Sequence, residues 1–197
     1  MTLLTPHTPK VIVLSGPSGT GKGTLVKRML EKRPDIQLSV SATTRSQREG
    51  EVHGKDYWFY TKEAFEKQIE DKGFLEWATY NGQYYGTPED KVRDALAQGK
   101  HVLLEIEVQG AFQVLSRFAA QAWLIFLHPP SLEVLRERLI TRGREPLEEI
   151  ERRLAIAAQE QPLAEKFHHQ VVNHTLEQGE RDLLFALPPA MPPVSTD

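Results

Sequence analysis

The chain has 197 residues, of which 40% are hydrophobic, with a formal net charge of −3 and no cysteine. This length fits one compact unit with small inserted subdomains, and the lack of cysteine excludes disulfides and thiolate metal sites. The small negative charge provides no general attraction to nucleic acid, and no apolar run approaches the roughly 18 residues of a membrane span. The first nine residues lack the basic and apolar segments of a secretory signal. We therefore predict a cytoplasmic protein that binds neither nucleic acid nor membranes.

A glycine-rich segment after the first predicted strand is the strongest functional signal. Residues 1–9 are predicted to form a flexible arm, residues 11–15 an apolar strand, and residues 22–32 a helix that ends before Arg33-Pro34. Glycines allow successive N–H groups to point at an anion, and the helix N-terminus adds positive charge. Strand, turn and helix in this order predict a loop that binds the phosphates of ATP. This phosphate loop consists of Gly16, Pro17, Ser18, Gly19, Thr20, Gly21, Lys22, Gly23 and Thr24.

Lys22 and Gly23 determine the expected chemistry of the phosphate loop. Lys22 reaches the outer phosphates, whereas Gly23 stands where a serine or threonine hydroxyl usually contacts Mg²⁺. Thr24 lies one residue later, about 100° further round the helix. Mg²⁺ keeps several waters when it binds, so we expect phosphates and water to hold it, with no direct protein ligand. The alternative interpretation of the segment is a glycine-rich turn without any ligand.

The next segment departs from a regular alternation of strands and helices. Its predicted elements are strands over 37–41 and 57–60, a charged loop over 43–56, and a helix over 62–72. Thr61 is predicted to cap that helix, and Asn81-Gly82 to form the turn of a hairpin. Thr87 is predicted to be the N-cap of a further helix that ends near Gly99. These features indicate a lobe inserted into the main fold.

The rest of the chain alternates apolar strands with helices. The predicted elements are strands over 101–106, 123–127 and 170–173, and helices over 110–118, 131–142, 146–159 and 176–187. Almost wholly apolar strands are typical of a buried parallel sheet, and the alternation predicts an α/β fold with helices on both faces of that sheet. The proline-rich residues 188–197 are predicted to be a disordered tail.

Two arginines in the inserted segment form a second candidate anion site. Arg45 and Arg48 lie in a polar loop with a glycine, and Tyr57, Tyr84 and Tyr85 of the same segment provide hydroxyl donors. Guanidinium groups bind phosphate through paired N–H donors. Taken alone, the two arginines are better explained as solvated surface charges. A phosphate loop upstream favours the functional interpretation, because transfer between two nucleotides requires a second phosphate site.

Five motifs in register resemble the guanylate kinase family. They are G-P-S-G-T-G-K-G-T at 16–24, S-V-S-A-T-T-R-S-Q-R-E-G-E-V-H-G-K-D-Y at 39–57, F-L-E-W-A at 74–78, Y-Y-G-T-P at 84–88, and L-L-E-I-E-V-Q-G-A at 103–111. The resemblance covers about residues 10–187. It implies transfer of the γ-phosphoryl group of ATP to GMP, giving ADP and GDP in purine nucleotide metabolism, with Mg²⁺. It also implies a P-loop NTPase core (10–42, 98–134 and 161–187), a GMP-binding lobe (43–97) and a helical lid (135–160).

The same resemblance implies roles for single residues. Those implied to bind GMP are Ser41, Arg45, Arg48, Glu51, Tyr57, Glu76, Tyr85, Thr87 and Glu107. Among them, the arginines and tyrosines resemble the groups around the GMP phosphate, and Ser41, Glu76 and Thr87 those that recognise guanine. Lys22, Arg48, Arg142 and Arg153 are implied to be catalytic. Asn173 resembles the residue beside the adenine of ATP, whereas Arg138 and Arg144 fit either the lid or a charged helix face.

Glu76, Glu105 and Glu107 are the carboxylates of interest. A carboxylate at Glu76 accepts from both N1–H and N2–H₂ of guanine, a donor pair that adenine lacks; without the resemblance it is a surface carboxylate beside Trp77. Glu105 and Glu107 are two apart at the end of a predicted buried strand, so we expect them on the same side of the sheet. The family usually has aspartate at the second position. Glu107 therefore contacts guanine, orders a Mg²⁺ water or supports an arginine.

Two other functions are compatible with these motifs. One is a guanylate-kinase-like interaction module without catalysis, which the complete phosphate loop and the lid arginines disfavour. The other is an enzyme with a different acceptor. Glu76 disfavours AMP, whereas nothing in the sequence recognises the 2′-hydroxyl, so dGMP is expected to serve as well.

Overall fold

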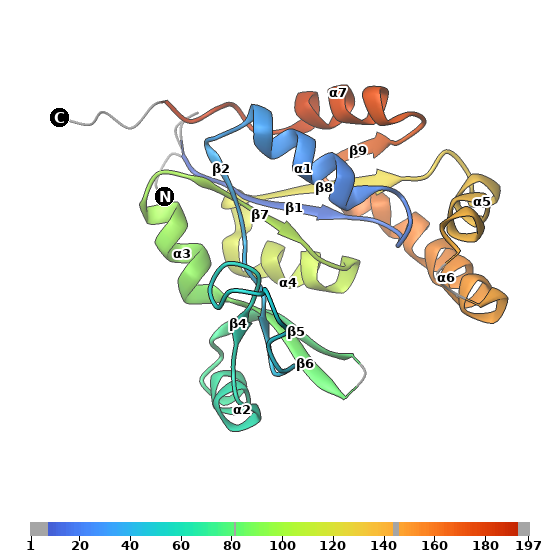
Figure 1. The fold of residues 1–197 in the computed structure, drawn as a ribbon. Coiled ribbons are helices and arrows are strands. Elements are labelled where there is room, and N and C mark those ends of the chain that lie inside the picture. Colours follow the sequence, from blue (N-terminus) through green and yellow to red (C-terminus); the bar gives the residue numbers. More distant parts are fainter. Residues whose placement is uncertain (1–7, 81, 144–145, 193–197) are drawn as a thin grey trace.

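A computed structural model describes residues 8–80, 82–143 and 146–192, which form two sheets and the helices around them (Figure 1). Some predictions fall outside these ranges. They are the arm before residue 8, the turn residue Asn81, the lid residue Arg144, and the tail after residue 192.

The larger sheet has five parallel strands in the order β2-β7-β1-β8-β9. They are β1 (Val11–Ser15), β2 (Ile36–Leu38), β7 (His101–Glu105), β8 (Ala122–His128) and β9 (His169–Val172). Every residue of β1 is buried, and successive side chains face opposite sides: Val11 and Val13 join one apolar cluster, and Ile12 and Leu14 join the other. Because both faces are apolar, both have to be covered by helices.

Helices cover both faces of this sheet, as the sequence predicts. The helices described outside the smaller sheet are α1 (Lys22–Lys32), α3 (Glu89–Ala97), α4 (Val108–Phe118), α5 (Leu132–Arg142), α6 (Leu147–Glu160) and α7 (Leu176–Ala186), with the 3₁₀ helices η1 (Ala119–Gln121) and η2 (Gln161–Lys166). Of these, α5 and α6 pack against each other in a separate apolar cluster. α1 and α7 pack on one face, where Leu25 and Leu183 share a cluster with Ile12 (Figure 1). α4 packs on the other, where Val114 joins the cluster of Val13. The predicted α/β fold with a parallel sheet is confirmed.

The smaller sheet projects from the larger one, and we call its residues 42–88 the small lobe (Figure 1). Its strand order is β4-β3-β6-β5. Its elements are β3 (Ala42–Thr43), β4 (Trp58–Phe59), β5 (Phe74–Tyr80), β6 (Gln83–Pro88) and the helix α2 (Lys62–Glu70). Phe65 stacks on Phe74 with 4.2 Å between ring centroids, and the two form its buried core with Ala42. Thr61 caps α2 as predicted, because its side chain accepts a hydrogen bond from Ala64 N.

Three local predictions are wrong. The strand predicted over 37–41 covers only Ile36–Leu38, because the following residues cross to the smaller sheet, where Ala42–Thr43 pairs with β6. Thr87 is not a helix cap: it lies in β6, and its hydroxyl donates to Glu76 instead. Glu107 does not share a buried strand with Glu105, because β7 ends at Glu105 and Glu107 precedes α4, with both side chains exposed.

Residues 188–192, predicted as the start of a disordered tail, are held against the edge of the larger sheet. Arg33 donates a hydrogen bond to Pro188 O at 3.1 Å. Pro189 O lies 3.0 Å from Nε2 of His101, which is buried at the start of β7. Proline lacks an N–H but keeps its carbonyl acceptor. Donors from the fold therefore fix a segment whose composition alone predicts disorder.

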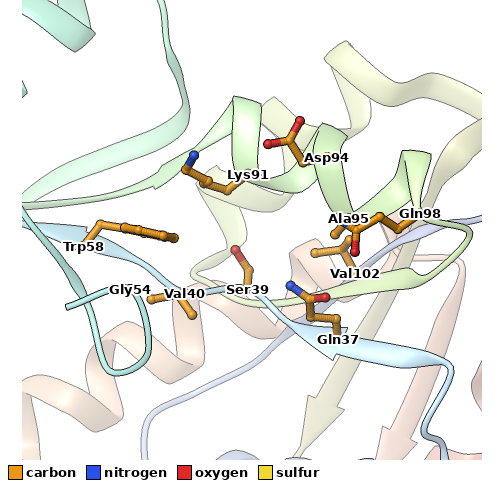
Figure 2. Close-up of a pocket in the computed structure, with 10 residues that line it drawn as sticks. All are labelled: Gln37, Ser39, Val40, Gly54, Trp58, Lys91, Asp94, Ala95, Gln98 and Val102. Atoms are coloured by element: carbon orange, nitrogen blue, oxygen red, sulfur yellow. The ribbon is translucent and has the colours of Figure 1, made fainter. Parts of the chain in front are cut away.

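A cavity of about 210 Å³ lies where the small lobe joins the larger sheet (Figure 2). The Trp58 ring forms one wall, with the Lys91 ammonium 5.2 Å from its centroid. The lining residues are Gln37, Ser39, Val40, Gly54, Trp58, Lys91, Asp94, Ala95, Gln98 and Val102. None of the predicted site residues lines this cavity, so the candidate site lies elsewhere.

Candidate functional site

The phosphate loop connects β1 to α1 at the carboxyl end of the central strand. Gly16 and Gly21 have φ of 140° and 91°, in the left-handed range that favours glycine. The Thr20 hydroxyl donates a hydrogen bond of 2.9 Å to Pro17 O, which closes the turn from within. Lys22 folds back over the loop, and its Nζ donates to Gly16 O at 2.6 Å and Pro17 O at 3.1 Å. The loop and its lysine therefore form one compact, positively charged unit.

Three carboxylates face Lys22 from three elements. Burial lowers the pKa of Lys22, and the charges of Glu105, Glu160 and Glu107 act in the opposite direction. Glu105 ends β7, Glu107 precedes α4, and Glu160 ends α6. Burial also raises the pKa of Glu160. Sequence reasoning missed Glu160, because only the packing of α6 brings this residue to the loop.

Arg153 of α6 reaches the phosphate loop directly. Its Nη1 donates a hydrogen bond of 2.6 Å to Ser18 Oγ, and its Nε donates to Glu149 at 3.0 Å. Arg152 also donates twice to Glu149, and the two arginines hold the pKa of that carboxyl at about 2. Glu149 is a second residue that the sequence analysis missed. Its spacing of three and four residues from the arginines is the signal that indicates such pairs on a helix.

Asn173 lies beneath the phosphate loop. It follows β9, is 5% exposed, and donates from Nδ2 to Thr20 O at 2.7 Å. Arg138 of α5 donates to Asn173 O at 2.9 Å and to His174 O at 3.1 Å. Arg138 is thus engaged with backbone carbonyls. Whether Asn173 contacts adenine stays a prediction.

Arg45, Glu51 and two tyrosines come together in the small lobe. Arg45 donates to both carboxylate oxygens of Glu51, at 3.0 Å and 2.7 Å, and a further hydrogen bond links it to Tyr85. The guanidinium carbon lies 5.4 Å from the centroid of Tyr57. The hydrogen bonds from Arg45 and from Arg48 N lower the pKa of Glu51. The Glu51 carboxylate therefore positions Arg45. A direct contact between Glu51 and GMP stays a prediction.

The other predicted arginines lie at the surface. The Arg48 side chain is exposed, and so is Arg142 at the last turn of α5, directly before the left-handed Gly143. Ser41 is half-buried, and its carbonyl accepts a hydrogen bond from Trp58 N at 2.8 Å, which fixes the entry into the small lobe. Exposed arginines of this kind are available to an anionic ligand.

Glu76 and Thr87 form a polar pair between the antiparallel strands β5 and β6. The Thr87 hydroxyl is buried and donates to Glu76 Oε1 at 2.6 Å. Burial raises the pKa of Glu76, and the negative charge of Glu107 adds to that shift. A desolvated carboxylate held by the hydroxyl and the backbone N–H of Thr87 retains acceptor capacity for a donor-rich ligand. The negative charge of Glu107, which directly precedes α4, acts on both Glu76 and Lys22.

The donor set beside the phosphate loop fits Mg²⁺ only through oxygen. Glu105 and Glu107 provide exposed carboxylates, which suit this hard cation, whereas Gly23 provides no hydroxyl. Within the described residues, no group of three or more His, Cys, Asp or Glu side chains forms a metal site. In the same part of the chain, no helix has the length and apolarity that crossing a membrane requires.

The fold and the site define a class of protein. A parallel α/β core with a phosphate loop after its central strand is that of a P-loop NTPase. The paired arginine and carboxylate groups of the small lobe add a second polar site, which a protein that binds one nucleotide does not need.

Comparisons with known proteins identify the family. The family profile described as guanylate kinase matches residues 8–187. The chain is 52% identical over 183 residues to a guanylate kinase of Gloeobacter violaceus, covering 91% of this chain and 89% of that one. It is 54% identical over 170 residues to one of Synechocystis, covering 86% and 88%. The crystal structure of guanylate kinase from Anaplasma phagocytophilum matches with a TM-score of 0.67 at 32% identity, covering 90% of this chain and 83% of that one. The chain belongs to the guanylate kinase family, as its motifs predict.

Proposed function

We propose that this protein is an ATP:GMP phosphotransferase, which moves the γ-phosphoryl group of ATP to GMP and releases ADP and GDP. Membership of the guanylate kinase family supports this proposal. The structural observation that supports it most is the presence of two polar sites, the phosphate loop with Lys22 and the Glu76–Thr87 pair of the small lobe, with the charge of Glu107 acting on both Lys22 and Glu76. One site is suited to the phosphates of ATP, and the other to a second nucleotide that accepts the phosphoryl group.

Guanine is the base that suits the Glu76–Thr87 pair. Guanine presents N1–H and N2–H₂ as adjacent donors, and the Glu76 carboxylate accepts from both while Thr87 fixes its orientation. Adenine has no such donor pair and would leave the remaining acceptor positions of the desolvated carboxylate unfilled. Hydrogen bonds to a charged group contribute about 1.5–3 kcal/mol, so this loss is enough to discriminate between the bases. Ser41 is proposed to complete the base site, and dGMP to serve as a second acceptor.

The GMP phosphate is proposed to bind at the arginines of the small lobe. Arg45 is positioned by Glu51, and Tyr57 and Tyr85 lie against the same guanidinium group. Arg48 is exposed and adds a second guanidinium group. Glu51 therefore acts on GMP through Arg45. Paired guanidinium donors bind a phosphate more strongly than single ones.

The donor side is proposed to bind ATP through the phosphate loop. Lys22 has to exchange its two carbonyl acceptors for phosphate oxygens, and Arg153, held by Glu149, covers the loop from α6. Arg142 is proposed to close on the same phosphates. Mg²⁺, when bound with ATP, neutralises charge on the outer phosphates, and the carboxylates of Glu105 and Glu107 would hold its water ligands.

The transfer itself requires alignment and charge neutralisation more than covalent chemistry by the protein. The acceptor is a GMP phosphate oxygen, which is largely ionised at neutral pH because the second pKa of a phosphate monoester is about 6. No general base is therefore needed. Movement of the lid (135–160) toward the small lobe is proposed to exclude water and so suppress ATP hydrolysis. We place this reaction in cytoplasmic purine nucleotide metabolism.

A coupled assay for ADP release tests this proposal. ATP and Mg²⁺ are held constant, and GMP, dGMP, AMP, CMP or no acceptor is added. We expect rapid turnover with GMP, substantial turnover with dGMP and almost none with AMP or CMP. Binding of ATP or GMP without any acceptor-dependent ADP release would instead support a non-catalytic interaction module.

A further inference from the structure

We infer that Asn173 is a positioning residue for the phosphate loop: its side-chain amide fixes the peptide between Thr20 and Gly21 so that the Gly21 N–H faces the bound phosphates. This inference rests on the proposed function, because it concerns how the same site binds ATP. It differs from the expectation of a contact with adenine, since the amide acts on the loop and not on the base.

The contact that supports this inference is short and enclosed. Asn173 donates from Nδ2 to Thr20 O at 2.7 Å, and both residues are buried. Asn173 itself is fixed at the end of β9, where its backbone N donates to His128 O at 2.9 Å. The amide therefore connects the phosphate loop, which follows β1, to the end of β9, two strands away in the larger sheet.

Because of peptide geometry, the hydrogen bond from Asn173 to Thr20 O also fixes the direction of the next N–H group, that of Gly21. In a trans peptide the C=O and the following N–H point in opposite directions, and the described chain contains no cis peptide. Because Thr20 O points at Asn173, the N–H of Gly21 points away from Asn173. If this peptide rotated, the loop would present a carbonyl to the phosphates and lose a donor.

The space around the amide is matched to asparagine. A Cβ on Gly21 would lie 2.8 Å from Nδ2, and a Cβ on Gly179 of α7 would lie 2.3 Å from Oδ1. Only Nδ2 can face Thr20 O, because both amide oxygen and carbonyl are acceptors. Oδ1 is buried without a partner in the described structure, which is unfavourable. Packing alone does not explain a side chain that buries Oδ1 without a hydrogen-bond partner. The hydrogen bond from Nδ2 to Thr20 O is the contact that accounts for an asparagine at this position.

Arg138 extends the constraint to the lid. It donates to the backbone carbonyls of Asn173 and His174, at 2.9 Å and 3.1 Å. Helix α5, the end of β9 and the phosphate loop are thus linked through one residue. This assigns Arg138 to the segment that positions the loop, which leaves Arg142 and Arg153 as the lid arginines for phosphate.

Calorimetric binding of ATP and of inorganic tripolyphosphate tests the inference, because tripolyphosphate has no base. We expect Asn173→Ala to weaken both ligands by about 10-fold, the loss that one hydrogen bond in a buried site explains. Asn173→Asp keeps the size of the side chain but replaces the donor with an anion, so it should weaken both ligands further. The KM for GMP should change less than about 2-fold in both variants, since they leave the small lobe intact.

The matched control is Gln121→Ala. Gln121 also donates from a side-chain amide to a backbone carbonyl, Pro9 O at 3.2 Å, at a point remote in sequence from the loop, and its loss should leave both affinities unchanged. Weaker ATP binding with unchanged tripolyphosphate binding would show an adenine contact and overturn the inference. Equal losses in Gln121→Ala, or a wild-type protein that binds no tripolyphosphate, would overturn it as well. Failure of the proposed function is a different result: wild-type protein that binds tripolyphosphate but releases no ADP with GMP.

Discussion

The two sheets of this protein differ in how they are held together. In the larger sheet, β1 is wholly buried between two apolar clusters, and helices cover both faces. The small lobe has a separate, smaller apolar cluster of Ala42, Phe65 and Phe74, whereas its buried Leu75 joins the cluster of the larger sheet. Its strand β5 shifts register between Phe74 and Trp77, and Trp77 is 45% exposed. Apolar burial is therefore concentrated on the side of the phosphate loop.

The phosphate loop and the small lobe also differ in the kind of group that they offer to a ligand. The phosphate loop offers backbone N–H groups, whose direction depends on a rigid core. The small lobe offers side chains such as Arg45 and Glu76, which hydrogen bonds from Glu51 and Thr87 orient locally. Regions with few buried apolar contacts open at lower free energy than the core. We therefore expect ligand binding to order the small lobe more than the loop.

Lys22→Ala should have the largest effect on turnover. It should also separate the contribution of the phosphate loop from that of the small lobe. Turnover should fall by about 10²–10³-fold, as when one preorganised charged donor is removed from a transition state. Affinity for GMP should stay within several-fold, because the small lobe is unchanged. ADP release and a GMP titration measure the two quantities. Lys27→Ala, an exposed lysine on the same helix, is the control. Near-normal turnover of Lys22→Ala would remove this lysine from the mechanism.

Glu76→Gln should affect the use of GMP at the small lobe and leave the binding of ATP at the phosphate loop unchanged. The kcat/KM for GMP should fall by about 10–100-fold, because a neutral amide accepts from only one of the two guanine donors. Activity with AMP, however low, should change much less, and the affinity for ATP should not change. Acceptor titrations of both nucleotides provide the comparison, with Glu70→Gln on α2 as an exposed control in the same lobe. Equal losses for GMP and AMP would show that Glu76 does not recognise the base.

Asp35→Asn should have the smallest effect, and on stability alone. Burial by itself would raise the Asp35 pKa, but hydrogen bonds from Arg33 and Met191 N and the charge of Arg33 lower it to about 2. A lowered pKa means that the ionised form stabilises the fold. That stability is present above the ordinary pKa of 3.8 and is lost as the pH falls toward about 2.

At neutral pH we therefore expect Asp35→Asn to reduce the free energy of unfolding by about 1 kcal/mol, with unchanged turnover. Urea unfolding at pH 7 and at pH 2.5 measures this, and the difference between variant and wild type should shrink at the lower pH. Asp71→Asn is the control, because its ion pair with Lys67 is exposed. A difference that grows as the pH falls would contradict the assigned sign.

Local patterns made much of the fold predictable. The helix over 22–32 ends where Arg33-Pro34 interrupts it, and the Thr61 cap forms as its sequence position indicates. Thr87 failed as a cap for a tertiary reason. A threonine before proline and two acidic residues is a good local start for a helix, but the hydroxyl has a partner on the neighbouring strand, Glu76. Long-range hydrogen bonds of this kind leave no trace in a window of adjacent residues.

The sequence by itself determined the phosphate loop, the family and most of the order of strands and helices, because each depends on residue types at fixed spacing along the chain. Only the tertiary structure decided which groups act on one another. It brought Glu160 to Lys22, Asn173 to Thr20, and the segment after Pro188 to the buried His101. These partners are far apart in sequence, and the contact between them exists only once the sheet has formed and the helices have packed on it.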